Sequence, residues 1–198
     1  GDGLIDMFYT RQNQWQVWYG RTRVWTPTQT SGEPISRLLF GEFDGSRSSR
    51  GQALLDACIA GGVNAELSTN IVREVWQKYV FLVGLSGTTA TIRKSIGLIR
   101  ENARTRAFLL DLMKEVVTVG RAHGVALPED YAAQRLAFAD TVPFDMTSSM
   151  HHDLERGNPL EVEWLSGGVV KLGAQAGVPA PANRAVWDIL ALHARGSK

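Results

Sequence analysis

Residues 71–90 read IVREVWQKYVFLVGLSGTTA, and this stretch decides what kind of fold the chain can adopt. Ser68 or Asn70 can cap a helix that begins here. Beyond Trp76 the faces of that helix are almost all apolar, and Lys78 is the main exception. A helix that is apolar on every side lies in the interior of a fold. We therefore expect a central buried helix from Ile71 to about residue 89.

The sequence after this stretch predicts further helices. Residues 104–123 carry apolar side chains on one face at steps of three and four. Two junctions, at residues 120–130 and 173–183, share a C-cap glycine, a valine able to pack back on the core, a proline stop and an N-cap. The remaining helices are expected at 128–139, 148–156, 160–176 and 183–194. The predicted fold class is mostly α, a helical bundle with a few short strands near the N-terminus.

The first 34 residues differ in composition from the rest. They hold six aromatic residues among Gln, Thr and Arg, and the alternation at 14–19 and 21–26 predicts one or two strands. Such a leader could form a hairpin that docks elsewhere, while residues 26–34 are typical of a linker. From residue 35 the pattern is regular, with short strands expected at 37–43 and 63–67 and a helix between them. We therefore expect a leader at 1–34 and one domain at 35–198.

Composition excludes several classes of protein. Lys and Arg number 21 against 20 for Asp and Glu, and no run of basic residues occurs, which argues against a nucleic-acid partner. The single cysteine, Cys58, excludes a disulfide framework and a thiolate zinc site. The longest apolar run, 79–85, is too short to span a membrane, and the first residues do not resemble a secretory signal. The expected protein is cytoplasmic, with neither membrane nor nucleic acid as partner.

Four side chains are candidates for chemistry. Lys78 lies within an apolar stretch, where a lysine either extends to the surface or is held in a pocket. Ser149 and Asp153 lie four residues apart, so a helix would place them on one face. Glu161 follows a Gly-Asn-Pro-Leu turn at the start of a helix. Each acid or serine could equally be an ordinary helix cap or a first-turn residue that suits the helix dipole.

Five segments, taken together and in order, carry a resemblance that none carries alone. They are LFGEFDG at 39–45, EVWQKY at 74–79, GVALP at 124–128, SSMHHD at 148–153 and NPLEVE at 158–163. This series resembles the C-terminal half of ketopantoate reductases, also called 2-dehydropantoate 2-reductases. The resemblance runs from about Arg37 to the end.

The resemblance implies a fold, a cofactor and a set of roles. Members join an N-terminal Rossmann domain, which binds NADPH, to an all-helical domain, and in pantothenate biosynthesis they reduce a 2-keto acid to a 2-hydroxy acid. Lys78 would be the general acid, since an ammonium can stabilise and protonate the oxygen that becomes negative when hydride adds. Glu161 would bind substrate and orient that lysine, Ser149 would contact substrate, and Asp153 would support the pocket. All four should then converge.

The chain also departs from the family pattern. Enteric-type members place asparagines four and eight residues after the lysine, whereas this chain has Leu82 and Ser86. We keep Ser86 as a substrate-binding candidate. A G-x-G-x-x-G fingerprint does not occur in the 198 residues, so the nucleotide-binding domain is expected to be absent from them. By itself the fragment is not expected to bind NADPH or transfer hydride.

Two other functions remain open at this point. An opened cleft could bind a divalent metal such as zinc through His151, His152 and Asp153 and support hydrolysis, although consecutive helical residues point about 100° apart. Alternatively, the domain is a non-catalytic dimerisation module, because apolar surface left uncovered can pair two copies. A homodimer is expected, because the six aromatic residues of the leader are too many to leave in water and could dock across a two-fold axis on a second chain.

Overall fold

The computed structural model describes residues 7–11, 14–19, 24–30 and 38–197. The chain divides into two compact units, Gly1–Ile71 and Val72–Lys198, which are described separately below as the first and the second unit.

The N-terminal part of the first unit is a sheet of three antiparallel strands in the order β1-β2-β3. The strands are β1 (Met7–Arg11), β2 (Gln14–Tyr19) and β3 (Val24–Thr30). Strand β3 continues to Thr30, so the linker expected from residue 26 was placed too early. Pro27 is tolerated in β3 because this strand is at the edge of its sheet. The side chains of the leader lie outside the described part of the structure, so its docking stays a prediction.

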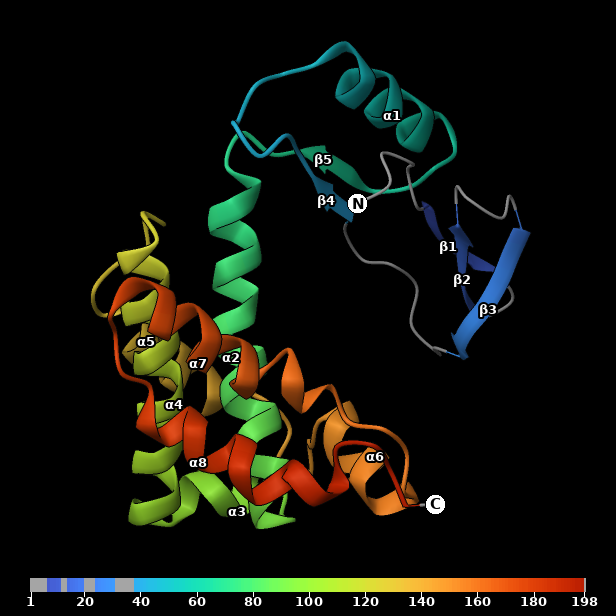
Figure 1. Cartoon of the computed structure of the whole chain (residues 1–198). Helices are drawn as coiled ribbons and strands as arrows, with labels where there is room; N and C mark the ends of the chain where they lie inside the picture. The colour runs from blue at the N-terminus through green and yellow to red at the C-terminus, as the bar shows by residue number, and fades with distance from the viewer. Residues whose placement is uncertain (1–6, 12–13, 20–23, 31–37, 198) are drawn as a thin grey trace. The chain divides into compact units, whose positions relative to one another are not determined.

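The rest of the first unit is a strand–helix–strand segment (Figure 1). It consists of β4 (Leu38–Phe40), α1 (Ser49–Ala60) and β5 (Ala65–Leu67). Strands β4 and β5 pair in parallel, and α1 makes the crossover that a parallel pair requires. Ser48 caps α1 by accepting a hydrogen bond from the Gly51 N–H, and Glu42 accepts hydrogen bonds from both Ser48 and Arg50. The three expected elements are confirmed, with shorter strands.

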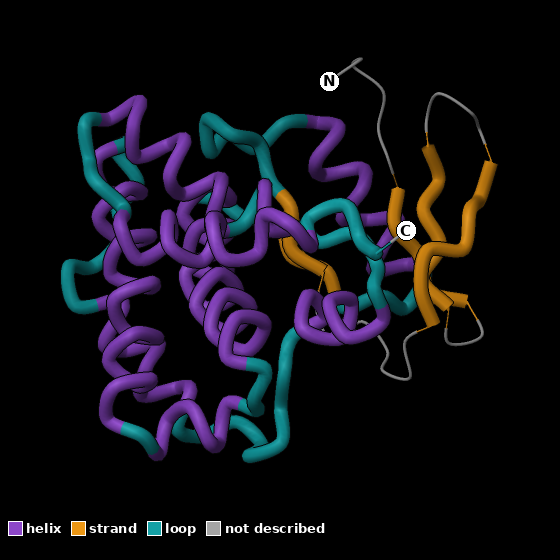
Figure 2. Tube along the Cα trace, turned by 60° about the horizontal axis from the view of Figure 1, so that its bottom comes forward, coloured by secondary structure: helices purple, strands orange, loops and turns teal. Residues whose placement is uncertain are grey.

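The second unit is a helical bundle (Figures 1 and 2). Its first helix begins one residue before the unit boundary. The helices are α2 (Ile71–Ile92), α3 (Ile96–Glu101), α4 (Ala103–Ala122), α5 (Tyr131–Ala139), α6 (Ser149–Arg156), the 3-10 helix η1 (Glu161–Glu163), α7 (Ser166–Ala176), α8 (Pro181–Leu190) and the 3-10 helix η2 (Ala191–His193). The mostly α fold class is therefore confirmed. Of the helices described, none is both long enough and apolar enough to cross a membrane.

Two details of the bundle differ from expectation. The sequence did not predict α3, which is only six residues long. Residues 160–176 form two helices instead of one, because Leu165 leaves the helical region with a ψ of −100° between η1 and α7. The resulting turn is closed by the N–H groups of Trp164 and Leu165, which both donate to the Glu161 carbonyl oxygen.

Glycines on α2 and α4 leave room for large side chains of the other helix. A Cβ on Gly84 would lie 2.6 Å from Met113 Cγ, and a Cβ on Gly120 would lie 2.7 Å from Trp76 Cε3. Residues 83–90 of α2 are buried on every side, as expected for a central helix. The hydroxyls of Thr88 and Thr89 donate to carbonyl oxygens one turn earlier in the same helix, which satisfies them inside the core.

The two expected junctions are confirmed. The Val125 N–H donates to the Gly120 carbonyl at 3.0 Å, and the Val178 N–H donates to the Gly173 carbonyl at 2.8 Å. The glycine before each valine has a positive φ, as a helix C-terminus of this kind requires. However, α8 begins at Pro181 and not at the expected Asn183. Its first N–H groups donate to the Glu115 carboxylate of α4, which caps the helix from a distance.

Candidate functional site

Lys78 and Ser86 lie on α2. Lys78 is exposed, whereas Ser86 is buried, with only 1% of its surface exposed. Eight residues advance a helix by about 80° beyond two full turns, so the two side chains share one side of α2. The Ser86 hydroxyl has no hydrogen-bond partner in the described part of the chain. The buried Ser166 hydroxyl is in the same state, so this observation leaves Ser86 able to donate a hydrogen bond but does not by itself mark a ligand site.

The turn that carries Glu161 is fastened to α2 beside Lys78. The Tyr79 hydroxyl lies 2.7 Å from the carbonyl oxygen of Leu165 and 2.9 Å from that of Trp164, and it donates to both. The Leu165 N–H in turn donates to the Glu161 carbonyl oxygen at 3.0 Å. Burial raises the pKa of Tyr79 above its ordinary value, so the hydroxyl keeps the proton that it donates. Glu161 itself is exposed.

The start of α6 is fastened to the same helix one turn beyond Ser86. Ser148 caps α6 by accepting a hydrogen bond from the His151 N–H, and its hydroxyl also lies 2.8 Å from the hydroxyl of Thr89. Ser148 and Thr89 are both buried. Ser149, the next residue, is exposed on the first turn of α6. The hydrogen bond between the buried Ser148 and Thr89 hydroxyls thus fixes the position of Ser149, the first residue of α6.

Two anchors therefore bring the candidate elements onto one side of α2. Tyr79 holds the turn that begins with Glu161, and Thr89 holds the start of α6. Within the described residues no hydrogen bond or ion pair joins Lys78, Ser86, Ser149 or Glu161 to one another. The convergence of their side chains stays a prediction.

Asp153 lies on α6 four residues after Ser149, as expected. Its carboxylate accepts a hydrogen bond from the Asn158 side chain at 3.0 Å. The Asn158 N–H also donates to the Asp153 carbonyl oxygen. Asp153 thus ties the end of α6 to the turn that leads to Glu161.

The two histidines of α6 stack on each other and share a carboxylate. Their ring centroids are 5.8 Å apart with an interplanar angle of 12°. Glu155 lies 3.1 Å from His151 Nε2 and 3.7 Å from His152 Nδ1. No group of three or more His, Cys, Asp or Glu side chains in the described ranges is placed to hold a metal ion. The alternative metal site of His151, His152 and Asp153 therefore receives no support from the geometry.

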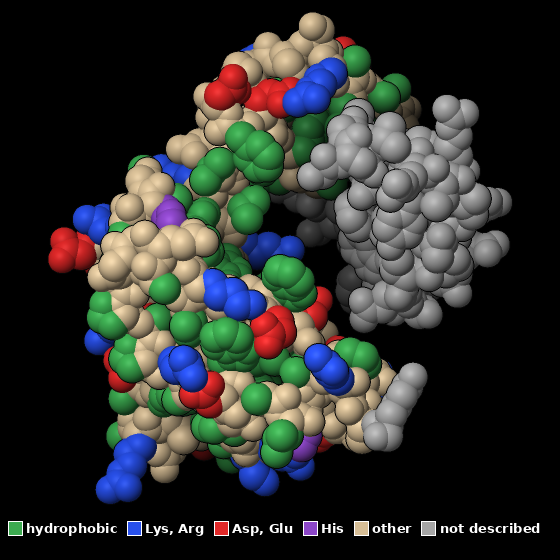
Figure 3. Space-filling view, viewed as in Figure 1, with side chains coloured by type: hydrophobic (Ala, Val, Ile, Leu, Met, Phe, Trp, Pro, Cys, Tyr) green, Lys and Arg blue, Asp and Glu red, His purple; other side chains and the backbone are tan. Residues whose placement is uncertain are grey.

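A groove that the sequence did not predict lies between α2 and the η1–α7 segment. Its volume is about 440 Å³. We call it the aromatic groove, and its lining residues are Val75, Trp76, Tyr79, Glu163, Trp164, Gly168, Lys171 and Leu172. Figure 3 shows hydrophobic side chains beside basic and acidic ones on the face of the second unit that carries α7 and α8. The sequence feature that could have pointed to this groove is the adjacent pair Glu163 and Trp164 within the NPLEVEW segment.

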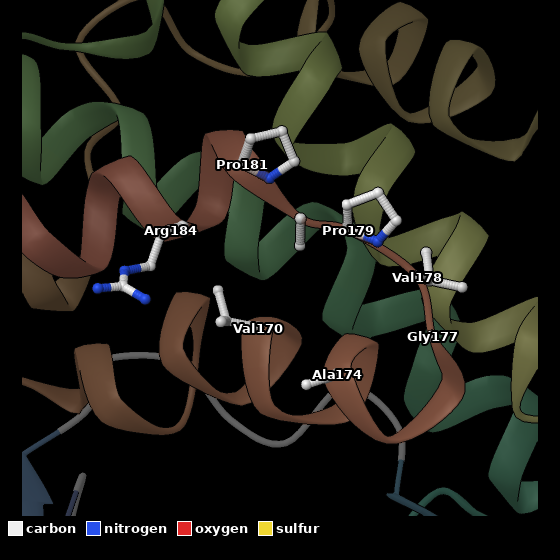
Figure 4. Close-up of a pocket in the computed structure, with 8 residues that line it drawn as sticks. Val170, Ala174, Gly177, Val178, Pro179, Pro181 and Arg184 are labelled. Atoms are coloured by element: carbon white, nitrogen blue, oxygen red, sulfur yellow. The ribbon is translucent and has the colours of Figure 1, made fainter.

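A second hollow lies between α7 and α8. Val170 and Ala174 of α7 face the segment 177–181, and the Arg184 guanidinium lies at the opposite end from Gly177 (Figure 4). Arg184 is the only charged residue of this lining, and its Nε lies 2.8 Å from both carboxylate oxygens of Asp188. This apolar hollow offers no group for acid–base chemistry.

The helices of the second unit, several of which meet on α2, form a bundle that can be compared with known families. The sequence model of the family described as "Ketopantoate reductase PanE/ApbA C terminal" matches residues 70–194. The chain belongs to this ketopantoate reductase family, which confirms the resemblance. The match begins within two residues of the boundary between the two units.

Individual relatives agree with this assignment. The uncharacterized oxidoreductase YkpB of Bacillus subtilis is 31% identical over 161 residues, which are 79% of this chain and 52% of that protein. The 2-dehydropantoate 2-reductase of Mesorhizobium japonicum is 31% identical over 154 residues, 78% of this chain and 47% of that protein. A PanE/ApbA family ketopantoate reductase structure from Ralstonia eutropha is 29% identical with a TM-score of 0.73, covering 83% of this chain and 53% of that one. The chain thus spans about half the length of the curated relatives it matches.

Proposed function

We propose that the second unit supplies the substrate-binding and proton-donating side of an NADPH-dependent reductase that converts a 2-keto acid into a 2-hydroxy acid. The observation that carries this proposal is the pair of anchors, Tyr79 and Thr89, which hold the Glu161 turn and the start of α6 on the side of α2 that bears Lys78 and Ser86. Membership of the ketopantoate reductase family supports it.

Lys78 is proposed as the general acid. When hydride adds to the carbonyl carbon, the electron pair of the C=O bond moves to oxygen, and an ammonium at that oxygen stabilises the charge and donates a proton. Lys78 is exposed and forms no ion pair with another described residue, so its ammonium is available to a substrate. NADPH supplies the hydride in this family, but these 198 residues contain no G-x-G-x-x-G loop to hold it, and we derive no step from its position.

The other candidates are proposed to bind and orient the substrate. Glu161, at the start of η1, would accept a hydrogen bond from the substrate or from the Lys78 ammonium. Ser149 and Ser86 would donate from their hydroxyls, and the unpartnered Ser86 hydroxyl retains its capacity to do so. Asp153 would act indirectly, because its bond to Asn158 holds the turn before Glu161.

The test joins this chain to the part of the Mesorhizobium japonicum reductase that lies outside the match and follows NADPH oxidation with 2-keto acids. Lys78→Met should lower kcat by at least about a hundredfold, the usual contribution of general acid catalysis. Lys94→Met is the matched control, since Lys94 is also exposed but follows α2. Equal kcat values for the Lys78 variant and the parent would contradict the proposal.

We also propose that the protein forms a homodimer. Two large apolar side chains near the end of the chain are strongly exposed, Ile189 at 60% and Leu192 at 94%. Neighbouring exposed apolar residues favour an interface, and a two-fold pair uses the same patch twice. Sedimentation at micromolar protein should give the mass of two chains, and Leu192→Ser should shift it towards one. A single-chain mass for the parent would remove the dimer.

A further inference from the structure

We propose that the aromatic groove is a binding site for a planar aromatic acid, with the ring against Trp164 and the carboxylate on Lys171. Neither Lys78 nor Glu161 lines this groove, so the site does not rest on the reductase proposal.

The shape and the surface of the groove suit a flat ring. A volume of about 440 Å³ falls within the usual range of small-molecule sites. Trp164 is 77% exposed and Val75 is 56% exposed, which leaves apolar surface available to cover. Beside Val75 on α2, the Trp76 and Tyr79 rings meet edge to face with centroids 5.7 Å apart. A ligand ring can therefore contact aromatic side chains from two separate elements.

The groove is kept open by a glycine. A Cβ on Gly168 would lie 2.8 Å from the Tyr79 hydroxyl oxygen, so a larger residue there would press on the tyrosine. The same hydroxyl donates to the Trp164 carbonyl oxygen and fixes the backbone that carries the exposed indole. Both walls thus have their positions set before a ligand arrives, which lowers the entropy lost on binding.

Among the charged groups of the groove, Lys171 has hydrogen-bond donors left over. The Tyr79 hydroxyl is occupied by the two carbonyl oxygens. Both oxygens of Glu163 accept a bond, one from Lys171 Nζ at 2.9 Å and the other from Trp187 Nε1 at 2.9 Å. Lys171 has three N–H donors and makes this one hydrogen bond in the described structure, so two donors remain.

The position of Lys171 also suits the binding of an acid that carries an aromatic ring. Its ammonium lies 5.8 Å from the centroid of the Trp164 ring and 5.0 Å from that of Trp187. A cation held next to an exposed indole can pair with the carboxylate of a ligand whose ring covers that indole. A neutral or cationic aromatic compound would leave the two donors unused.

The experiment titrates the full 198-residue chain with indole-3-propionate and follows binding by calorimetry. Indole-3-propionamide keeps the ring without the charge, and cyclohexanepropionate keeps the charge without an aromatic ring. We expect saturable binding of the acid, and at least about fivefold weaker binding of either comparison compound, since a charge-assisted bond or a stacked ring contributes roughly 1 kcal/mol or more.

Variants locate the site. Trp164→Ala should weaken binding of the acid by at least about tenfold, as expected for a central aromatic contact. Lys171→Met should remove the preference for acid over amide while ring binding persists. Leu98→Ala is the matched control, because it removes an exposed apolar side chain outside the groove. Circular dichroism of each variant checks its fold, and Lys94→Met, which removes an exposed lysine outside the groove, should bind the acid like the parent.

Three results would overturn the proposal. The first is the absence of saturable binding, and the second is equal affinity of the parent and Trp164→Ala for the acid. The third is a chain that self-associates through the groove, seen as a dimer that Trp164→Ala dissociates and indole-3-propionate leaves intact.

Discussion

The two halves of α2 belong to one helix, yet they differ in how deeply they are buried. From Ile71 to Tyr79 the residues are half-buried or exposed, and they include Lys78 together with three residues of the aromatic groove. From Val83 to Ala90 every residue is buried. The first half is thus only partly covered, whereas the second half is fully enclosed.

The difference comes from side-chain size more than from polarity. In the second half, glycines let α4 approach until Met113 and Leu112 occupy the space where a Cβ would stand. The buried Thr88 and Thr89 hydroxyls there are satisfied because they donate to the helix backbone. In the first half Val75 is apolar but 56% exposed. A continuous apolar sequence therefore indicates a core helix without indicating which of its turns are enclosed.

The largest effect on stability is expected when a bulky side chain is added to the enclosed half of α2. Gly84→Val should destabilise the chain by about 3 kcal/mol, because its Cβ would lie 2.6 Å from Met113 Cγ and overpacked cores lose 1–3 kcal/mol or more. Urea unfolding followed by circular dichroism measures the loss. Val75→Ala in the first half is the control and should change stability by less than about 0.5 kcal/mol. Similar losses at the two positions would show that the halves are equally enclosed.

A smaller effect is expected at Tyr79, which anchors the Glu161 turn to the first half of α2. Tyr79→Phe should cost about 1–2 kcal/mol, because the carbonyl oxygens of Trp164 and Leu165 lose their shared donor. The same unfolding measurement applies. Tyr131→Phe removes a hydroxyl from another mostly buried tyrosine, which makes no hydrogen bond within the described residues, and should be nearly neutral. A neutral Tyr79→Phe would mean that packing alone holds the turn.

The smallest effect is a pH dependence in the aromatic groove. Hydrogen bonds from Lys171 and Trp187 hold the pKa of Glu163 below its ordinary value of about 4.5. A carboxyl group whose pKa is lower in the folded state stabilises the fold at a pH above its unfolded pKa. This stabilisation is lost as the pH falls through the folded-state pKa. The Trp187 indole N–H resonance should therefore shift in that acidic range. Glu163→Gln should abolish the shift, and a shift that persists in this variant would assign it to another group.

The aromatic groove could not be predicted from the sequence. Trp76, Tyr79 and Trp164 are separated by up to 88 positions, and each is ordinary in its own helix or turn. The break at Leu165, which presents the Trp164 ring, has no proline or glycine at that residue to announce it. The cap of α8 is similar, because the carboxylate comes from Glu115 on another helix. Such contacts depend on how helices pack, and no local pattern records them.

By itself the sequence determined the α2 helix, the strand–helix–strand segment, the two glycine junctions and membership of the ketopantoate reductase family. These follow from side-chain periodicity, from glycine at positive φ and from short motifs, all of which act within a few turns of chain. Only the tertiary structure decided that Tyr79 holds the Glu161 turn, that Thr89 holds the start of α6, and that three aromatic residues form a groove. The physical reason is that hydrogen bonds and close packing between distant residues arise only after the helices have docked.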